Sequence, residues 1–447
     1  MTALSCPPLR SLLAGNPDFD PQSVSVAQAR ALLSAWVPSP GQPRVLPLYD
    51  ALQHTLATHL IAPFDQPPHD CAAMDGYALR HADLRAGGET VLPVAGHSLA
   101  GDAPGQLPPG HVWRIMTGAP LPTGADTVVM QEDTCAVPAS SADTASSIRI
   151  ATGQRAGQHV RRQGEDLQQG DVALPAGSPL GAVELGMAAA LGLDHVTVWP
   201  ALRVGVFSTG SELARHGQPL APGQIHDSNR PALLALIRNQ GSQPVDLGSV
   251  PDHPDALAST LLSAANRVDV LLSTGGAAGG DADLLQPVLN GQHPTTGHLG
   301  PDTEAQSWRL RLRPGRPLVV GRVRGVPLFG LPGNPVAALM SVLFVIDAAL
   351  QKMAGRTPRP LPRIRAQAAC AIPKRPGRLE LPRVRLCYHT SDHQAVPQAT
   401  LTSSQSSALL RSLVEADGIA ILPEAQGPLA VGDWLDVVPL RGLLTAA

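Results

Sequence analysis

Helical spacing of apolar residues first appears near the N-terminus. Ala27, Ala31 and Leu32 recur at the interval of one helix face. Ser25 stands just before them, and a serine hydroxyl readily accepts a hydrogen bond from the first turn of a helix. We therefore predict a helix here, with Ser25 as its N-cap.

From Val45 to about Leu202 the pattern changes to short apolar runs broken by Gly and Pro. Such runs are typical of β-strands joined by tight turns. The clearest of them cover residues 91–93, 112–116 and 128–131. One helix is predicted within this region, near residues 185–191, so the N-terminal half should be rich in β-structure.

After Pro200 predicted strands and helices alternate. The strands cover residues 203–208, 245–247, 268–273 and 327–331, and helices are predicted over 256–265 and 335–354. Another helix is expected to be capped by Asn229 and to end at Gly241. Residues 268–273 are apolar throughout, as in a parallel strand buried on both faces. Repeated βα units predict a central three-layer α/β domain with a mostly parallel sheet and right-handed crossovers.

The chain becomes rich in Pro and Arg beyond Thr357, and a linker is predicted at about residues 355–362. Three later apolar runs, at 384–388, 418–422 and 434–438, suit a small β-barrel or sandwich. The predicted fold class is therefore a multidomain α/β plus β protein, with a β-rich N-terminal region and a small C-terminal β-barrel.

Composition narrows the class of function. The chain has 447 residues, enough for about three domains. Hydrophobic residues make up 43%, charged residues 15%, and the formal charge is −3, which excludes a mainly disordered chain. No block of Lys or Arg gives the electrostatic footprint of a nucleic-acid-binding protein. We expect no nucleic-acid partner.

Neither a membrane anchor nor a disulfide framework is expected. The longest apolar run, residues 336–346, stops at Asp347, short of the roughly 20 residues that span a bilayer. The N-terminus lacks the pattern of a signal peptide. The five cysteines are scattered singly, which indicates neither disulfide pairing nor a zinc site. A cytoplasmic location follows as an expectation.

Three predicted strands end in polar or Gly-rich loops, at residues 209–212, 274–276 and 332–335. Because ligands of open α/β sheets bind beyond the carboxyl ends of the strands, these loops predict a phosphate or oxyanion site. For any single loop, a glycine that only makes a tight turn is an equally open interpretation. The chain contains no Gly-x-Gly and no Gly-Lys pair, so neither common nucleotide fingerprint is present.

Acidic residues stand in or next to turns beside these loops: Glu212, Asp227, Asp281 and Asp283. Carboxylates in such places can hold Mg²⁺ through its water shell. The alternative is that they form N-caps and Asx-turns, and it stays open for Asp227 and Asp283 especially.

Eight segments stand out along the chain: AAMDGYALR (72–80), RIMTGAPLPTGAD (114–126), VRRQGED (160–166), FSTGSEL (207–213), GQIHDSN (223–229), STGGAAGGDAD (273–283), RPGRP (313–317) and LPGNPVAAL (331–339). In this order they resemble the signature segments of the molybdopterin molybdenumtransferases, the MoeA-type family that includes the E domain of gephyrin. The resemblance runs from about Ser25 to Pro439, and AMDGY and LPGNP are its most diagnostic segments.

The resemblance implies an activity in molybdenum-cofactor biosynthesis. Molybdate is inserted into adenylylated molybdopterin, the phosphoanhydride is cleaved, AMP is released, and Mg²⁺ is required. An elongated homodimer is implied, with the site formed between the α/β domain of one subunit and the N-terminal region of the other. The implied protein partners are the molybdopterin adenylyltransferase and molybdoenzyme maturation proteins.

The same resemblance implies four domains. An elongated domain consists of residues 25–65 and 156–200, and a β-rich domain, 66–155, is inserted in it. The α/β molybdopterin-binding domain covers 201–356, and the C-terminal β-barrel covers 362–440.

Positions that match the family's functional residues can be named one by one. The implied catalytic residues are Asp75, Thr117, Asp166, Glu212, Asp227 and Asp283, of which the last three are also the expected Mg²⁺ ligands. The implied substrate- and anion-binding residues are Arg162, Thr209, Gly210, Ser273, Gly275, Gly276, Arg313, Arg316, Pro332, Gly333, Asn334, Arg383 and Ser407. Arg378 is a further candidate anion clamp, since guanidinium groups bind oxyanions through two parallel hydrogen bonds.

Two departures from the family pattern bear on activity. Arg313 and Arg316 stand where the family usually has lysines, and the chain has only two lysines in all, so a general Lys-to-Arg drift explains the exchange. Residues 277–279, Ala-Ala-Gly, replace a segment that commonly carries a serine. Loss of that hydroxyl removes one hydrogen bond of about 1 kcal/mol.

Two other functions are compatible with parts of the sequence. A catalytically impaired paralogue that carries the pterin or nucleotide, or serves as a scaffold, is motivated by the altered segment 277–279. An adenylyltransferase acting one step earlier is motivated by a similar α/β domain, and the β-rich N-terminal half argues against it. Turnover with Mg²⁺ and molybdate would indicate the transferase. Stoichiometric binding without turnover would indicate the carrier, and consumption of ATP would indicate the adenylyltransferase.

Overall fold

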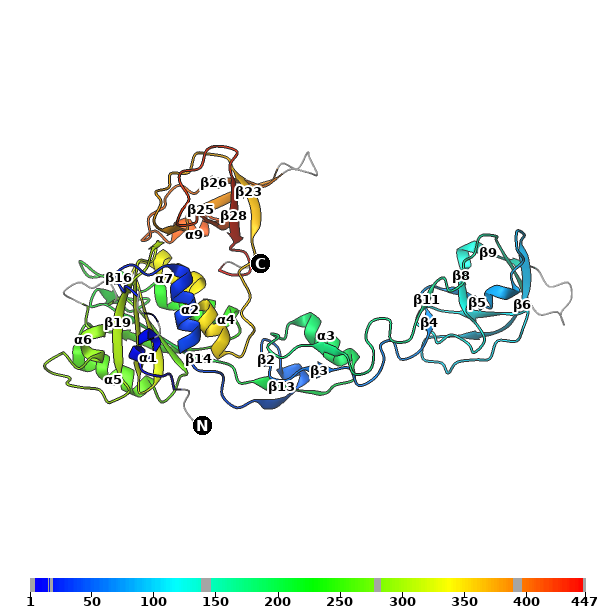
Figure 1. The fold of residues 1–447 in the computed structure, drawn as a ribbon, viewed down its shortest axis with the longest axis horizontal. Coiled ribbons are helices and arrows are strands. Elements are labelled where there is room, and N and C mark those ends of the chain that lie inside the picture. The colour runs from blue at the N-terminus through cyan, green and yellow to red at the C-terminus, as the bar shows by residue number, and fades with distance from the viewer. Residues whose placement is uncertain are drawn as a thin grey trace. The chain divides into compact units, whose positions relative to one another are not determined.

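The computed structural model describes residues 5–14, 16, 19–137, 146–276, 283–388 and 396–444. The chain forms two compact units (Figure 1). The larger unit comprises Met1–Thr58, Gly177–Ala182 and His195–Ala447, and the smaller unit comprises His59–Ala176 and Val183–Asp194.

A six-stranded sheet forms the centre of the larger unit. Its strands lie in the order β17 (Gln243–Val250), β14 (Arg203–Thr209), β18 (Val270–Thr274), β22 (Val326–Leu331), β21 (Pro317–Val323) and β19 (Glu304–Arg309). The first four are parallel, as predicted. The strand β21 pairs antiparallel with β22, and β19 pairs antiparallel with β21. Every residue of β18 and β22 is buried, which explains their continuous apolar runs. The sequence prediction lacked β19 and β21.

Helices cover both faces of this sheet, so the domain has three layers (Figure 1). Val270 and Leu272 of β18 face the layer that contains α2 (Val26–Trp36), α4 (Asn229–Asn239) and α7 (Pro335–Ser341). The intervening Leu271 faces α5 (Pro254–Ala264) and α6 (Leu285–Leu289). The alternation follows from the two-residue repeat of a strand.

The ends of two predicted helices test the capping assignments. Ser25 caps α2 as predicted, because its Oγ accepts a hydrogen bond from the Gln28 N–H at 3.0 Å. Asn229 does not cap α4: it is the first helical residue, and Ser228 holds the N-cap position. The first N–H groups of the helix donate to the side chain of Asp227, two residues earlier. The predicted cap was therefore wrong, because three polar residues follow one another here and the sequence does not show which of them accepts these bonds.

The long helix after the third loop is continuous but not uniform. It consists of α7, the π-helical turn η4 (Val342–Ile346) and α8 (Asp347–Met353). By length and composition Pro335–Met353 could cross a membrane, but its most apolar window is 89% buried inside the protein. Packing against α2 and the sheet therefore accounts for its apolar sequence.

The C-terminal residues form a closed barrel, as predicted. Its strands are β23 (Ile364–Ala368), β26 (Gln398–Leu401), β25 (Arg383–Cys387), β27 (Gly418–Ile421) and β28 (Trp434–Pro439). The barrel has a small core of its own, and Leu381, Leu413 and Ile419 join the main core of the α/β layers.

The N-terminal region is rich in β-structure, as predicted. In the smaller unit, six strands lie in the order β8 (Thr127–Met130), β5 (Gly76–Leu79), β7 (Val112–Ile115), β6 (Thr90–Ser98), β10 (Ser147–Ile150) and β9 (Thr134–Val137). The predicted helix near 185–191 is α3 (Ala182–Ala190). In the larger unit, β1 (Arg44–Pro47), β13 (His195–Trp199) and β2 (Thr55–Leu56) form a separate sheet.

Candidate functional site

Three loops meet at one edge of the central sheet. They follow β14, β18 and β22, which are parallel neighbours, so their carboxyl ends share that edge. The first two loops touch through backbone: a Cβ on Gly275 would overlap the Thr209 carbonyl oxygen, and the φ of Gly275 is +88°. Only glycine fits there. The third loop lies close by, since a Cβ on Gly333 would be 3.8 Å from the Gly275 Cα.

Asn229 connects the second and third loops. Its Nδ2 donates to the Thr274 Oγ1 at 2.6 Å and to the Gly333 carbonyl at 2.7 Å. Thr274 Oγ1 in turn donates to the Pro332 carbonyl at 3.2 Å. These bonds fix two loops against the start of α4. Sequence reasoning placed Asn229 only as a helix cap, and its position directly after Asp227 and Ser228 gave no further signal.

Asp227 anchors the start of α4. Its side chain is 3% exposed, Oδ1 accepts from the N–H groups of Asn229 and Arg230, and Oδ2 accepts from the Arg230 Nε at 3.0 Å. Arg230 also pairs with Asp246 at 2.6 Å. Burial acts to raise the Asp227 pKa, but the neighbouring Ser208 hydroxyl and Arg230 outweigh it and hold the pKa below its usual value. Asp227 is thus an ionised, fully engaged carboxylate.

Glu212 and Asp283 lie beside the same loops. The Glu212 carboxylate packs on Gly210, where a Cβ would lie 2.6 Å from its Oε2, and the Glu212 residue is exposed. A Cβ on Gly276 would lie 3.0 Å from the Thr209 Oγ1 and 3.7 Å from the Asp283 Oδ1. The structure therefore brings five of the predicted residues together: Thr209, Gly210, Glu212, Gly276 and Asp283.

The described residues provide an incomplete set of metal ligands. Across the described ranges, no group of three His, Cys, Asp or Glu side chains is placed to hold an ion. Both Asp227 oxygens already accept hydrogen bonds, so this residue fits poorly as a Mg²⁺ ligand. Glu212 and Asp283 fit better, because Mg²⁺ commonly takes only one or two carboxylates and completes its shell with water and phosphate.

Several polar atoms at this edge are buried and, within the described part of the chain, have no hydrogen-bond partner. They include Thr209 Oγ1, Ser273 Oγ and Asn229 Oδ1. Buried polar atoms of folded proteins are nearly always paired, so unpaired ones at a sheet edge indicate groups that a ligand can satisfy.

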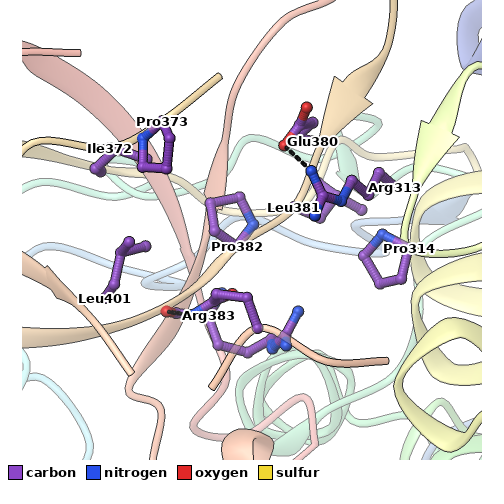
Figure 2. A pocket seen from close by; sticks show the side chains of 10 residues that line it. Arg313, Pro314, Ile372, Pro373, Glu380, Leu381, Pro382, Arg383 and Leu401 are labelled. Atoms are coloured by element: carbon purple, nitrogen blue, oxygen red, sulfur yellow. Dashed lines mark hydrogen bonds and ion pairs between the residues drawn. The ribbon is translucent and has the colours of Figure 1, made fainter. Parts of the chain in front are cut away.

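Arg313 and Arg383 line a pocket of about 90 Å³ where the barrel meets the α/β layers (Figure 2). Arg313 is exposed and lies 3.5 Å from Glu380. Arg383 is 1% exposed, and its burial together with the Arg313 charge lowers its pKa to about 10. The Glu380 carboxylate offsets the charge of Arg313, so Arg383 gives the pocket its net positive charge.

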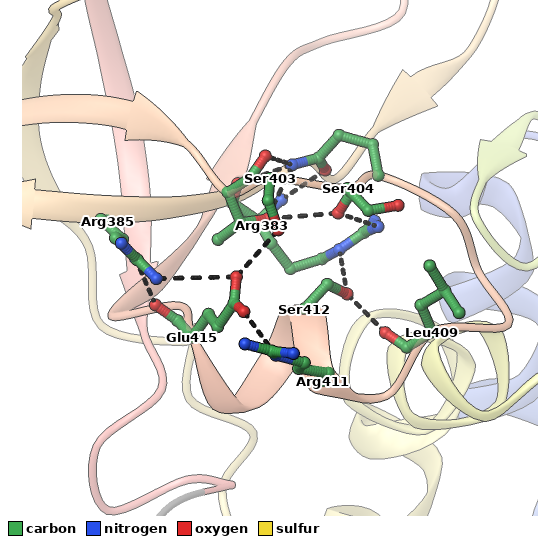
Figure 3. A network of polar contacts seen from close by, with 10 residues as sticks. Arg383, Arg385, Ser403, Ser404, Leu409, Arg411, Ser412 and Glu415 are labelled. Carbon is green, nitrogen blue, oxygen red and sulfur yellow. Dashed lines mark hydrogen bonds and ion pairs between the residues drawn. The ribbon is translucent and has the colours of Figure 1, made fainter.

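Neutral groups hold the Arg383 side chain (Figure 3). Its Nε donates to the Ser412 Oγ at 3.2 Å, and its Nη2 donates to the carbonyls of Ser404 and Ser406 at 3.3 and 3.1 Å. None of the ion pairs formed by the described residues includes it. A buried cation without a carboxylate partner is unusual and is suited to bind an anion.

Ser407 joins this pocket to the sheet edge. Its Oγ accepts from the Asn334 Nδ2 at 3.0 Å, and its carbonyl accepts from the Val336 N–H at 3.1 Å. The preceding residue, Ser406, binds Arg383. Arg316 is exposed and does not line the pocket, although Arg313 and Pro314 of the same loop do. The larger unit thus brings the predicted residues of the α/β loops and of the barrel into one continuous region.

The predicted residues of the smaller unit form a second group. Asp75 Oδ1 accepts from both the N–H and the Oγ1 of Thr117, each at 2.7 Å. These two bonds lower the pKa of the exposed Asp75 carboxyl below its usual value. The structure therefore pairs two residues that stand 42 positions apart in sequence.

Arg162 and Asp166 lie on the neighbouring segment. The strand β11 (Val160–Arg161) pairs with β4 (Cys71–Ala72), just before Asp75. Arg162 Nη1 donates to the Asp70 carboxylate at 2.7 Å, a partner that sequence reasoning missed. Asp166 is exposed in the following turn. Residues 277–282, including the altered segment 277–279 and Asp281, lie outside the described residues.

Comparison with known families covers most of the chain. Residues 24–192 match the N-terminal region of MoeA (domains I and II), 205–352 match a probable molybdopterin binding domain, and 365–440 match the C-terminal region of MoeA (domain IV).

Similar proteins and structures agree with these matches. A molybdopterin molybdenumtransferase of Haemophilus influenzae is 31% identical over 94% of this chain and all of its own length. Molybdopterin molybdenumtransferase 2 of Mycobacterium tuberculosis is 35% identical over 89% of this chain and 95% of its own. The crystal structure of a molybdopterin biosynthesis MoeA protein from Pyrococcus horikoshii is similar with a TM-score of 0.73, at 26% identity over 93% of this chain and all of that one. The chain belongs to the molybdopterin molybdenumtransferase family.

Proposed function

We propose that this chain inserts molybdate into adenylylated molybdopterin in molybdenum-cofactor biosynthesis and releases AMP. The observation that carries the proposal is the meeting of three anion-type loops at the carboxyl ends of β14, β18 and β22. Membership of the family adds the identity of the substrates.

The loops bind the phosphate-containing part of the substrate. Backbone N–H groups in the three loops, at residues 212, 275–276 and 333–334, are suited to contact phosphate oxygens. Buried hydroxyls of Thr209 and Ser273 are further donors. Such fixed donors stabilise the charge that develops when a phosphoanhydride is cleaved.

The arginine pocket binds the second anion, molybdate. Arg313 and Arg383 supply the guanidinium groups, and Ser407 links this pocket to Asn334 of the third loop. Arginine retains the charge that lysine supplies in the family and adds a planar fork of donors. Because the protein holds the substrate phosphates and molybdate in one continuous region, the two anions need not approach each other against their mutual repulsion in solution.

The site would take Mg²⁺ together with the phosphates of the substrate, and the ion would supply positive charge there. Glu212 and Asp283 would hold it, and it would neutralise charge on the anhydride. Asp227 orients the start of α4 in place of binding the ion, since its oxygens are already engaged.

In a homodimer, Asp75 and the Thr117 that is hydrogen-bonded to it act on the substrate that is bound by the loops of the other subunit. A dimer is supported by exposed apolar side chains in the larger unit, where Val45 is 64%, Tyr49 94% and Leu52 53% exposed. Mixed dimers of D75N and E212Q test this arrangement. If the two residues come from different subunits, mixing restores about a quarter of the activity, whereas a site within one subunit stays inactive.

The cellular setting is proposed on the resemblance alone. The chain works in the cytoplasm, receives its substrate from a molybdopterin adenylyltransferase and passes its product to molybdoenzyme maturation proteins. A carrier or scaffold function finds no support in the described residues.

The decisive experiment is AMP release from adenylylated molybdopterin by the purified protein, with Mg²⁺, in the presence and absence of molybdate. Molybdate-dependent release is the expected result. Tight pterin binding without release would overturn the proposal in favour of a carrier, and consumption of ATP would favour an adenylyltransferase.

A further inference from the structure

Asn229 has a fixed orientation at the sheet edge. The Gly333 carbonyl can only accept a hydrogen bond, so the Asn229 atom 2.7 Å from it is the donor Nδ2. Thr274 Oγ1 donates its own hydrogen to Pro332, and therefore accepts from the same Nδ2. Both amide hydrogens are committed to the loops, which leaves Oδ1 as a pure acceptor.

The Asn229 Oδ1 is buried, and no donor of the described residues reaches it. An unpaired buried acceptor costs about 1–3 kcal/mol. Thr209 Oγ1 and Ser273 Oγ, also buried and unpaired at this edge, are hydroxyls and can donate to an anion. Oδ1 cannot do so: it repels phosphate oxygens and attracts N–H or O–H groups.

We propose that Asn229 is a positioning residue that locks the second and third loops together, and that its Oδ1 accepts a hydrogen bond from an amino or hydroxyl group of the bound substrate. The inference rests on the proposed function and deepens it, because it assigns a neutral donor of the substrate to a point between the anion loops. Adenine, ribose and pterin all carry such donors.

Paired probes identify the donor. AMP is compared with 2′-deoxy-AMP, with 3′-deoxy-AMP and with purine riboside 5′-monophosphate, which lacks the adenine amino group. Pterin is compared with lumazine, in which an oxygen replaces the amino group. In one of these pairs, the wild-type protein is expected to bind the analogue that lacks the donor about fivefold more weakly than AMP or pterin, which is the effect of one neutral hydrogen bond.

Two variants separate the roles of the amide. Asn229→Ala removes both the donors and the acceptor, so binding weakens and the preference within the sensitive pair disappears. Asn229→Asp keeps an acceptor but loses the donors to Gly333 and Thr274, so all probes weaken alike while the preference remains. Asn239→Ala, at the exposed far end of α4, is the matched control and should behave as wild type.

A purely structural asparagine would lower affinity for every probe equally and leave the preference intact in Asn229→Ala. That result would overturn the ligand contact, as would a wild-type protein that shows no preference or binds none of the probes. Unchanged binding of all probes by Asn229→Asp would overturn the positioning role. Failure of the proposed function is distinguishable, because it appears as absent AMP release by the wild-type protein.

Discussion

Asp75 in the smaller unit and Asp227 in the larger unit carry the same functional group in different surroundings. Asp75 is exposed, and among the described residues Thr117 is the one that donates to its carboxylate. Asp227 is buried, and both of its oxygens accept hydrogen bonds at the start of α4. Each has a lowered pKa, so both are ionised at neutral pH. Exposure leaves Asp75 with oxygens that can reach a substrate, whereas Asp227 is committed to holding a helix and an arginine.

The largest effect is expected at Asp75. Asp75→Asn keeps the shape and removes the charge, and AMP release should fall by about a thousandfold, as for other catalytic carboxylates. Because the side chain is exposed, the melting temperature should stay within a few degrees of wild type. Asp133→Asn, an exposed position of the same unit, is the control. Activity close to wild type in Asp75→Asn would remove Asp75 from the reaction.

Asp227→Asn should instead act on stability. It leaves the partly buried Arg230 with one ion-pair partner among the described residues, Asp246, and we expect a loss of about 3 kcal/mol in the free energy of unfolding. Urea denaturation measures it, with the exposed Asp255→Asn as control.

The pH dependence of that variant sharpens the test. The folded pKa of Asp227 lies below its ordinary 3.8, so the carboxylate stabilises the fold above that pH and loses its effect as pH falls through the folded pKa. Wild-type stability should decline over this acidic range, and Asp227→Asn should lack that part of the decline. An equal decline in both proteins would contradict the assignment.

Thr117 should have an intermediate effect. Thr117→Val removes one of two hydrogen bonds to the Asp75 carboxylate, which should reduce AMP release about tenfold. The Asp75 pKa should rise toward its ordinary value, so the acid limb of the pH–rate profile should move to higher pH. Thr117→Ser retains the hydroxyl, so its rate of AMP release and the position of its acid limb should match those of the wild-type protein. A profile that does not move would show that Asp75 does not set this limb.

The smallest effect is expected at Arg313. It is exposed and already lies beside Glu380, so Arg313→Gln should raise the molybdate concentration needed for half-maximal AMP release by only about fivefold. Arg267→Gln, exposed on the same unit, serves as control. A loss as large as that of Asp75→Asn would mean that Arg313 contacts the reacting atoms directly.

The sequence determined the arrangement of elements wherever local rules suffice. The strands β14, β18 and β22 could be predicted because each is a short run of apolar residues. The ends of α2 and α4 could be predicted because a capping serine, Ser25, and a terminating glycine, Gly241, act on residues close in sequence. Parallel order then fixes which strand ends share an edge, so the meeting of three loops could be predicted. The family followed from ordered motifs.

Tertiary structure alone decided the partners of the charged and polar side chains. The antiparallel strands β19 and β21 escaped prediction because their burial depends on the neighbours they pair with. Nothing local shows that Asn229 reaches Gly333, 104 residues away, or that Arg383 is enclosed by neutral groups. Such contacts are set by how distant segments pack, and packing decides whether a carboxylate such as Asp227 supports the fold or, as at Asp75, remains accessible to a substrate.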